Sequence, residues 1–148
     1  MTLIALVDDE NSIRTSVSMA LESEGFKVDV FQNGLEAIEA LESKNYDLGL
    51  FDIKMPKMDG SELLSKVRSS RIGRLKEMPI IFLTSKDQEQ DEIIGLRMGA
   101  ADYITKPFSQ KLLNERIKTV LRIYENRKNE VMLEDNIINN FKKGSLEL

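Results

Sequence analysis

Short apolar runs alternate with longer amphipathic segments along the first 124 residues of this chain. The apolar runs lie at residues 3–7, 27–31, 48–51, 80–83 and 103–105. Each has the length of a strand, and each is followed by a segment whose apolar residues recur at helical spacing. This alternation predicts an α/β fold with a doubly wound, five-stranded parallel sheet and helices on both faces. Right-handed crossovers favour the flavodoxin-like strand order 2-1-3-4-5.

The helical segments are bounded by recognisable start and stop signals. Gly25 and Gly99 are placed to end two of the helices, and Ser109 is placed to cap the last one. The predicted helices cover residues 11–24, 33–43, 60–70 and 87–98, and a long final helix follows Ser109.

The composition changes after Tyr124, which suggests that a first domain covers residues 1–124. Residues 125–143 are rich in Asn, Lys and Glu, so they either extend the last helix or form a linker. Residues 144–148 alternate between polar and apolar side chains, like the opening of a strand. A single strand of that length does not fold alone, so residues 125–148 are predicted to be a linker and the start of a second domain.

Several kinds of chemistry are excluded by composition. The chain has no cysteine and no histidine, which removes disulfides, thiolate metal sites, Ser-His-Asp catalysis and imidazole bases. A bound metal would need oxygen ligands, as Mg²⁺ does. The net charge of −4 makes DNA binding by this chain alone unfavourable. No signal peptide and no run long enough to cross a bilayer is recognisable, so we expect a cytoplasmic protein.

Four of the apolar runs end in residues that bind metal or phosphate. Asp8 and Asp9 follow the first, Asp52 the third, Thr84 the fourth and Lys106 the fifth. In a parallel sheet these strand ends meet at the carboxyl edge, where open α/β folds bind ligands. The sequence therefore predicts a site for a divalent cation and a phosphoryl group.

Asp52 is the candidate nucleophile of this site. A carboxyl group with the ordinary pKa of about 3.9 is ionised at pH 7, so it needs no general base. A cation held by the carboxylates and the ammonium group of Lys106 would stabilise charge on the transferring oxygens. The hydroxyl of Thr84 is placed to donate a hydrogen bond to the product phosphoryl group.

The complete pattern resembles the response-regulator receiver domain, over roughly residues 1–122. The matching segments are VDDE at 7–10, DIKMPKMDG at 52–60, LTSK at 83–86 and GAADYITKPF at 99–108. The last two segments look most like the OmpR/PhoB group of two-component transcription regulators, and particularly its ChvI-like members.

The resemblance implies a role for each matching residue. Asp52 would accept phosphate from a phosphohistidine of a sensor histidine kinase. Mg²⁺ or Mn²⁺ would be bound directly by Asp9, through water by Asp8, and by Asp52 and the backbone carbonyl of Lys54. Thr84 and Tyr103 would form a switch pair, Lys106 would contact the phosphoryl group, and the Lys106–Pro107 bond would be cis.

The resemblance also implies a homodimer on phosphorylation and a DNA-binding output. The dimer face would contain Asp91, Glu92, Asp102, Arg116, Lys118 and Arg122. Ala101 stands where the group commonly has an acidic residue, which removes one charge from this face. A winged-helix domain would follow the receiver, and residues 144–148 resemble its first strand. We therefore expect a switch protein rather than an enzyme. Its only expected chemistry is its own phosphorylation and dephosphorylation.

Other readings of the same residues remain open. Asp8 and Asp9 are also suitable caps for the first helix, Thr84 is a suitable cap for the helix after it, and Lys106 is an ordinary surface charge when considered alone. A haloacid-dehalogenase-like phosphatase also uses a nucleophilic Asp and Mg²⁺, but it carries D-x-D at the first strand, and that spacing is absent. A stand-alone receiver or pseudo-receiver that acts by protein–protein interaction is a third possibility.

Overall fold

The computed structural model describes residues 1–85 and 99–147. Its helices and strands are, in chain order, β1 (Leu3–Val7), α1 (Asn11–Ser23), β2 (Lys27–Phe31), α2 (Gly34–Ser43), β3 (Leu48–Asp52), α3 (Gly60–Arg68), α4 (Gly73–Lys76), β4 (Ile80–Ser85), β5 (Asp102–Lys106) and α6 (Gln110–Glu147). The predicted strands and helices are found within two residues of their expected ends, except that the predicted helix 87–98 lies outside the described residues.

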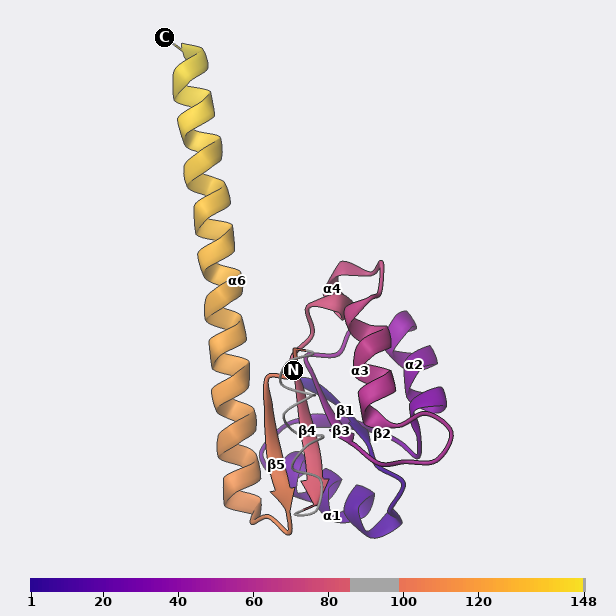
Figure 1. Cartoon of the computed structure of the whole chain (residues 1–148). Coiled ribbons are helices and arrows are strands. Elements are labelled where there is room, and N and C mark those ends of the chain that lie inside the picture. The colour runs from indigo at the N-terminus through magenta and orange to yellow at the C-terminus, as the bar shows by residue number, and fades with distance from the viewer. Residues whose placement is uncertain (86–98, 148) are drawn as a thin grey trace.

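The five strands form one parallel sheet in the order β2-β1-β3-β4-β5, which confirms the predicted fold (Figure 1). β3 is the central strand, and its last residue, Asp52, pairs in register with Leu83 of β4. Thr84 pairs with Thr105 of β5. This register brings the ends of β1, β3, β4 and β5 to one edge of the sheet.

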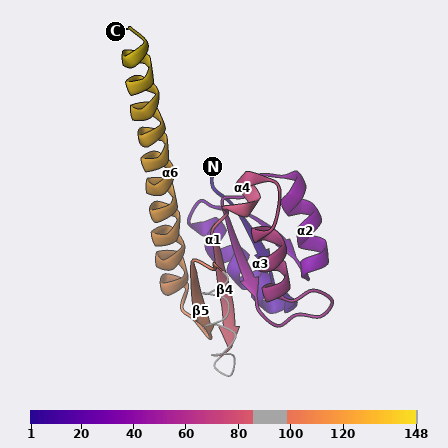
Figure 2. The same ribbon diagram turned by 45° about the horizontal axis from the view of Figure 1, so that its top comes forward.

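Alternating strand residues divide the core into two layers. Ala5 and Val7 face α2, α3 and α4, whereas Ile4 and Leu6 face α1 and α6. Figure 2 shows α2 and α3 together on one side of the sheet and α6 on the other. The near-continuous apolar sequences of β1, β3 and β4 follow from this arrangement, because both faces of these strands are buried.

The short helix α4 was not predicted from the sequence. Its residue Arg74 donates hydrogen bonds to the carbonyl oxygens of Leu41, Glu42 and Lys44 at 2.9–3.2 Å. These carbonyls belong to the end of α2, where backbone acceptors lack helical partners. α4 therefore forms as part of a tertiary contact, and a single turn of this kind carries too little periodicity to be recognised in advance.

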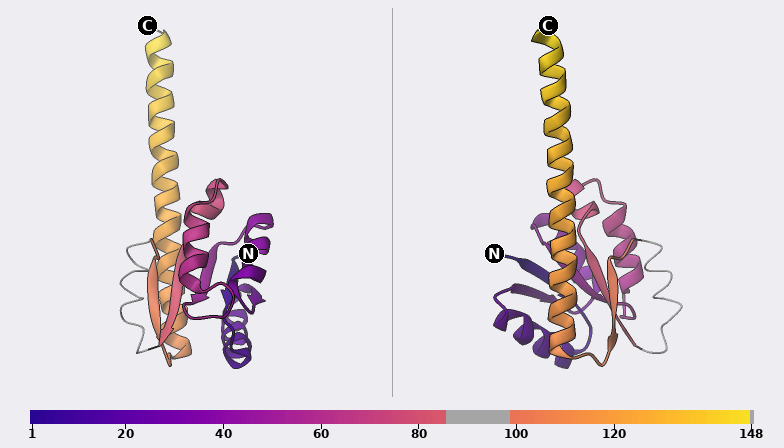
Figure 3. Two further views of the ribbon diagram at one scale, coloured as in Figure 1. Left: turned by 45° about the vertical axis from the view of Figure 1, so that its right-hand side comes forward. Right: turned by 90° about the vertical axis from the view of Figure 1, so that its left-hand side faces the viewer.

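The last helix continues much further than the sheet requires. Ser109 caps it, since its hydroxyl accepts from the backbone N–H of Leu112 at 3.0 Å. The C-terminal part of α6 projects well beyond the rest of the chain (Figures 1 and 3). The strand-like reading of residues 144–148 was wrong for residues 144–147, which are helical. Among the described residues, no helix combines the length and the apolar character that a membrane span needs.

Candidate functional site

The predicted site residues do meet at the carboxyl edge of the sheet. Asp8 and Asp9 follow β1, Asp52 ends β3, and Lys106 ends β5. One carboxylate oxygen of each of the three aspartates lies within 4.8 Å of the other two. Asp8 and Asp52 are buried, whereas Asp9 is exposed. The cluster therefore has two buried carboxylates and one exposed carboxylate, an arrangement that a small hard cation can bridge.

Asp8 is fixed by contacts to three neighbours. One of its oxygens accepts from the backbone N–H of Glu10 at 2.9 Å, and the other accepts from the ammonium group of Lys106 at 2.8 Å. Its backbone carbonyl accepts from the guanidinium of Arg14 at 2.8 Å. Asp8 does not cap α1, whose N-cap is Glu10 and has no side-chain capping bond. Its bond to Glu10 fixes the turn before the helix, and its second oxygen belongs to the cluster.

Lys106 bridges the acidic groups. Its ammonium nitrogen lies 2.8 Å from Asp8, 3.5 Å from Asp52 and 3.9 Å from Glu10. Burial opposes the charge of Lys106, but the hydrogen bond from its ammonium group to Asp8 and the charge of Asp52 raise its pKa above the ordinary value. Lys106 is therefore a cation at neutral pH. The Lys106–Pro107 peptide bond is cis, as the resemblance implied.

The environment of Asp52 changes the interpretation of its chemistry. Burial, followed by the charge of Asp8, raises the pKa of Asp52 from 3.8 to about 7, although Lys106 opposes this rise. The expectation that Asp52 is fully ionised at pH 7 was therefore wrong for the metal-free protein. A divalent cation would lower the pKa of Asp52 by offsetting the charges of Asp8 and Asp9.

The chemistry of the site fits a divalent cation with oxygen ligands. The carboxylates are close enough to share one ion, and their mutual repulsion disfavours the metal-free state at neutral pH. Asp8 has both oxygens engaged by protein donors, so Asp9 and Asp52 are the carboxylates with more freedom to bind the ion directly.

Two residues of the site were not predicted from the sequence. Glu10 lies 3.9 Å from Lys106, and Arg14 holds the carbonyl of Asp8. Glu10 is part of the VDDE segment, so its position beside the aspartates was a usable signal. Arg14 lies one helical turn into α1, and only the packing of α1 on the sheet shows that it reaches back to Asp8.

Thr84 and Tyr103 are placed on one face of the sheet. Thr84 of β4 is fully buried, and Tyr103 of β5 is half-buried against the core layer that contains Phe82. Tyr103 pairs with Phe82 in the register, and residues 82 and 84 point to the same face. The two predicted switch residues are therefore diagonal neighbours on adjacent strands.

Three of the predicted dimer-face residues, Asp102, Arg116 and Lys118, have partners within the chain. Asp91 and Glu92 lie outside the described residues. Arg116 contacts Asp102 at 2.9 Å in the same chain. Lys118 contacts Glu24 of the α1 cap at 2.8 Å, and Arg122 is exposed on α6. The structure thus pairs Asp102 with Arg116 within one chain, whereas the resemblance implied that both residues belong to a face between two copies.

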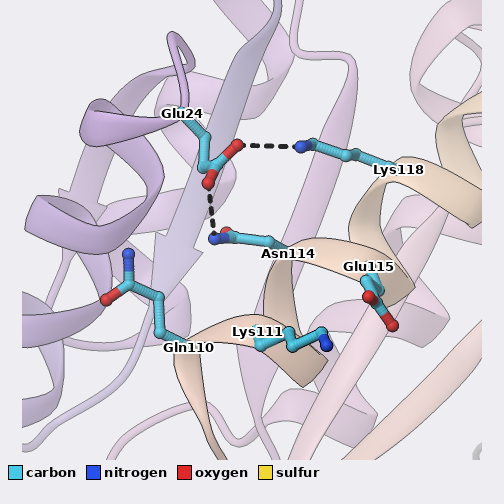
Figure 4. Close-up of a pocket in the computed structure, with 6 residues that line it drawn as sticks. All are labelled: Glu24, Gln110, Lys111, Asn114, Glu115 and Lys118. Atoms are coloured by element: carbon cyan, nitrogen blue, oxygen red, sulfur yellow. Dashed lines mark hydrogen bonds and ion pairs between the residues drawn. The ribbon is translucent and has the colours of Figure 1, made fainter.

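The contact of Lys118 belongs to a pocket between the end of α1 and the start of α6 (Figure 4). Its volume is about 450 Å³. Glu24 accepts from the side-chain amide of Asn114 at 3.3 Å and from Lys118 at 2.8 Å. Among the described residues, the amide oxygen of Asn114 is buried without a hydrogen-bond partner. These contacts hold α6 against α1, and the pocket carries no acidic cluster of its own.

Comparison with known proteins agrees with this geometry. The sequence profile of the response regulator receiver domain matches residues 4–118. The chain is 40% identical over 134 residues to the transcriptional regulatory protein YclJ of Bacillus subtilis, covering 90% of this chain and 57% of YclJ. It is 41% identical over 119 residues to the alkaline phosphatase synthesis transcriptional regulatory protein PhoP of the same organism, covering 80% of this chain and 48% of PhoP.

Solved structures show the same similarity. A CheY-like response regulator receiver domain protein from Methanospirillum hungatei superposes with a TM-score of 0.79 at 34% identity. That match covers 86% of this chain and 98% of the other. The chain spans about half the length of the curated relatives it matches.

Proposed function

Because the chain belongs to the response regulator receiver domain family, we propose that it is controlled by phosphorylation at Asp52. One observation carries this proposal: Asp52 ends the central strand as part of an acidic cluster, 3.5 Å from the ammonium group of Lys106. A nucleophilic carboxylate, a cation site and a fixed positive charge are the parts that phosphoryl transfer to an aspartate requires.

The proposed donor is a phosphohistidine on a sensor histidine kinase. A carboxylate oxygen of Asp52 attacks phosphorus, the P–N bond breaks, and its electron pair leaves with the imidazole, which takes up a proton. Lys106 is near enough to Asp52 to contact the transferred phosphoryl group. The product is an acyl phosphate on Asp52, and its hydrolysis would return the protein to its starting state.

The proposed cofactor is Mg²⁺, which Mn²⁺ can replace. Asp9, Asp52 and the backbone carbonyl of Lys54 would bind the ion directly, and Asp8 would act through a water molecule. The bound ion supplies positive charge that favours the ionised form of Asp52 and screens the incoming phosphate. The engagement of both Asp8 oxygens by Glu10 and Lys106 supports this division of roles.

Acetyl phosphate provides a direct test, because it is a small donor that needs no kinase. With Mg²⁺, the protein should gain one phosphoryl group, detected by intact mass, and Asp52→Asn should gain none. Asp59, which is half-buried and caps α3 next to the site, supplies a control. Asp59→Asn should be phosphorylated like the wild-type protein, since Asn caps a helix as well as Asp. Phosphorylation that persists in Asp52→Asn, or that proceeds equally in excess chelator, would refute the proposal.

Phosphorylation is proposed to act through Thr84 and Tyr103. The hydroxyl of Thr84 would turn to the phosphoryl group, and Tyr103 would move inward into the space that this opens. Their diagonal position on β4 and β5 supports such a coupling. The phosphoryl group can shift the equilibrium between the inactive and active conformations only as far as it interacts more favourably with the active one.

Homodimerisation is the proposed result of this shift. Asp102 and Arg116 would then each pair with the other residue of a second copy instead of with each other. This exchange changes the free energy little, because both side chains are partly exposed. Sedimentation of the free and beryllofluoride-bound protein at equal concentration tests this. The dimer should be lost in Arg116→Glu and restored by adding Asp102→Arg. Monomeric profiles in both states would reject the dimer.

The proposed output is control of transcription in the cytoplasm. Residues 1–124 would be the receiver, and residues 125–148 would link it to a winged-helix DNA-binding domain. The regulatory names of YclJ and PhoP support this, and their greater length leaves room for such a domain. The alternative is a stand-alone receiver that acts by protein–protein interaction. The reading frame that encodes the chain distinguishes the two.

A further inference from the structure

Gly34, the first residue of α2, is in direct contact with the loop that follows Asp52. Its backbone N–H donates to the carbonyl oxygen of Met58 at 3.2 Å. A Cβ atom added at Gly34 would lie 2.8 Å from that oxygen and 2.8 Å from both Cβ and Cγ of Met58. Side-chain carbons do not approach other atoms so closely, so this contact requires a residue without a side chain.

Backbone conformation does not account for the glycine. Among the described residues, positive φ angles occur at Gly25, Lys57 and Gly99, and Gly34 is not one of them. Capping does not account for it either, because Asn33 supplies the cap of α2 by accepting from the backbone N–H of Glu36 at 3.0 Å. The close approach to Met58 is the remaining physical reason for a glycine at this position.

Met58 ends a tight turn in the loop. Its backbone N–H donates to the carbonyl oxygen of Pro56 at 2.9 Å, and the residue between them, Lys57, has a φ of 70°. This is a γ-turn with positive φ, a conformation that is rare and strained. The buried side chains of Met55 and Met58 hold the loop from the core side. Gly34 holds it from the side of α2.

The other end of the loop is held in a similar way. The backbone N–H of Gly60 donates to the carbonyl oxygen of Ile53 at 2.7 Å. A Cβ atom at Gly60 would overlap the carbonyl oxygen of Asp52. Two glycines therefore hold the loop that carries Lys54. Gly60, the first residue of α3, contacts the backbone of Asp52, and Gly34, the first residue of α2, contacts Met58.

We propose that Gly34 is a positioning residue for the cation site. Its contact with Met58 sets the course of residues 53–59, and through them the position of the Lys54 carbonyl relative to Asp9 and Asp52. A methyl group at residue 34 displaces Met58 or the start of α2, and the carbonyl moves with the loop. This inference rests on the proposed function, since Lys54 acts as a ligand only if the acidic cluster binds a cation.

The test compares Gly34→Ala with Gly73→Ala. Gly73 is also the first residue of a helix, α4, but a Cβ atom there meets nothing within 4 Å. Calorimetric titration with Mg²⁺ should show about tenfold weaker binding to Gly34→Ala, as for other residues that orient metal ligands. Gly73→Ala should bind Mg²⁺ as the wild-type protein does. Thermal unfolding in chelator reports the stability of each variant separately.

A purely structural role would lower the melting temperature of Gly34→Ala without changing the Mg²⁺ affinity of its folded form. That result overturns the inference. Failure of the wild-type protein to bind Mg²⁺ would instead refute the proposed function, so the two failures are distinguishable.

A second measurement uses the wild-type protein and does not depend on how the variant folds. Hydrogen exchange of the Gly34 amide, followed by NMR, should slow when Mg²⁺ binds, because the ion fixes the loop that accepts this hydrogen bond. The Gly73 amide should exchange at the same rate in both states. An unchanged rate at Gly34, in a sample whose Asp9 amide signal shifts with Mg²⁺, would contradict the inference.

Discussion

Replacing Asp52 with Asn should stabilise the metal-free protein, by an amount that grows with pH. In the folded protein, burial and the charge of Asp8 raise the pKa of Asp52 from 3.8 to about 7. The folded state therefore binds this proton more tightly than the unfolded state does. Between these two pKa values, the free energy of unfolding of the wild-type protein falls as pH rises. Asn carries no titrating proton and escapes this loss.

The size of the effect follows from the two pKa values. Each pKa unit corresponds to about 1.4 kcal/mol, so the full difference is at most about 4.5 kcal/mol. Asp52 borders the exposed Asp9, where solvent reduces the penalty. We therefore expect a gain of about 2–4 kcal/mol above about pH 7, and a gain near zero below about pH 4.

Urea unfolding followed by circular dichroism measures this gain, since the chain has no tryptophan for fluorescence. Wild-type protein and Asp52→Asn are compared in chelator at several pH values between about 5 and about 8. Glu39→Gln, an exposed substitution on α2, controls for the loss of one negative charge. Its effect should be small at every pH.

Added Mg²⁺ should reduce the stability difference between Asp52→Asn and the wild-type protein. A ligand at one hundred times its dissociation constant stabilises the folded state by about 2.7 kcal/mol. Asp52→Asn lacks one of the proposed ligands, so it gains less than the wild-type protein. The reasoning is refuted if Asp52→Asn is no more stable than wild type near pH 8 in chelator, or if its gain is the same at every pH.

Three further predictions concern single contacts. Lys106→Ala should bind Mg²⁺ at least as tightly as wild type by calorimetry, because it removes a cation from the cluster, but it should lose the phosphorylation-induced NMR shifts; full shifts would show that Lys106 is not the coupling residue. Asp9→Ala should weaken Mg²⁺ binding more than Asp8→Ala, since both Asp8 oxygens already accept from protein donors; equal, unimpaired titrations would remove the proposed site. Arg68→Met should lower the free energy of unfolding by about 2–4 kcal/mol, because Arg68 donates to the carbonyl oxygens of three residues at 2.7–3.2 Å, whereas exposed Arg71→Met should change it by less than about 0.5 kcal/mol; similar urea midpoints for both variants would contradict this.

The strands and the edge at which the site lies could be predicted from the sequence. Local patterns determine them: the apolar runs mark buried strands, and a parallel sheet brings the ends of such strands together. Asp8, Asp9, Asp52 and Lys106 therefore could be placed at one edge before any distance was known. Their contacts in the structure agree with that placement.

Local patterns failed where a contact joins distant segments. α4 forms because Arg74 hydrogen-bonds to the end of α2, and the sequence of the four residues of α4 does not indicate this contact. The length of α6 was left open, because residues 125–143 suit a helix and a linker equally. The partner of Arg116 could not be predicted either, because it depends on which acidic side chain lies close to Arg116 in the folded chain. That residue is Asp102, because β5 and α6 are neighbours.

Only the tertiary structure decided how the site residues influence one another. Lys106 and Asp8 are 98 residues apart, and their hydrogen bond exists because β1 and β5 belong to one sheet. The raised pKa of Asp52 likewise depends on its burial and on the charge of Asp8. Neither can be predicted from the sequence of residues 48–52 alone. The contact between Gly34 and Met58 is of the same kind. The sequence determines which groups reach the edge of the sheet, whereas packing sets their distances and solvent access, and these quantities control charge.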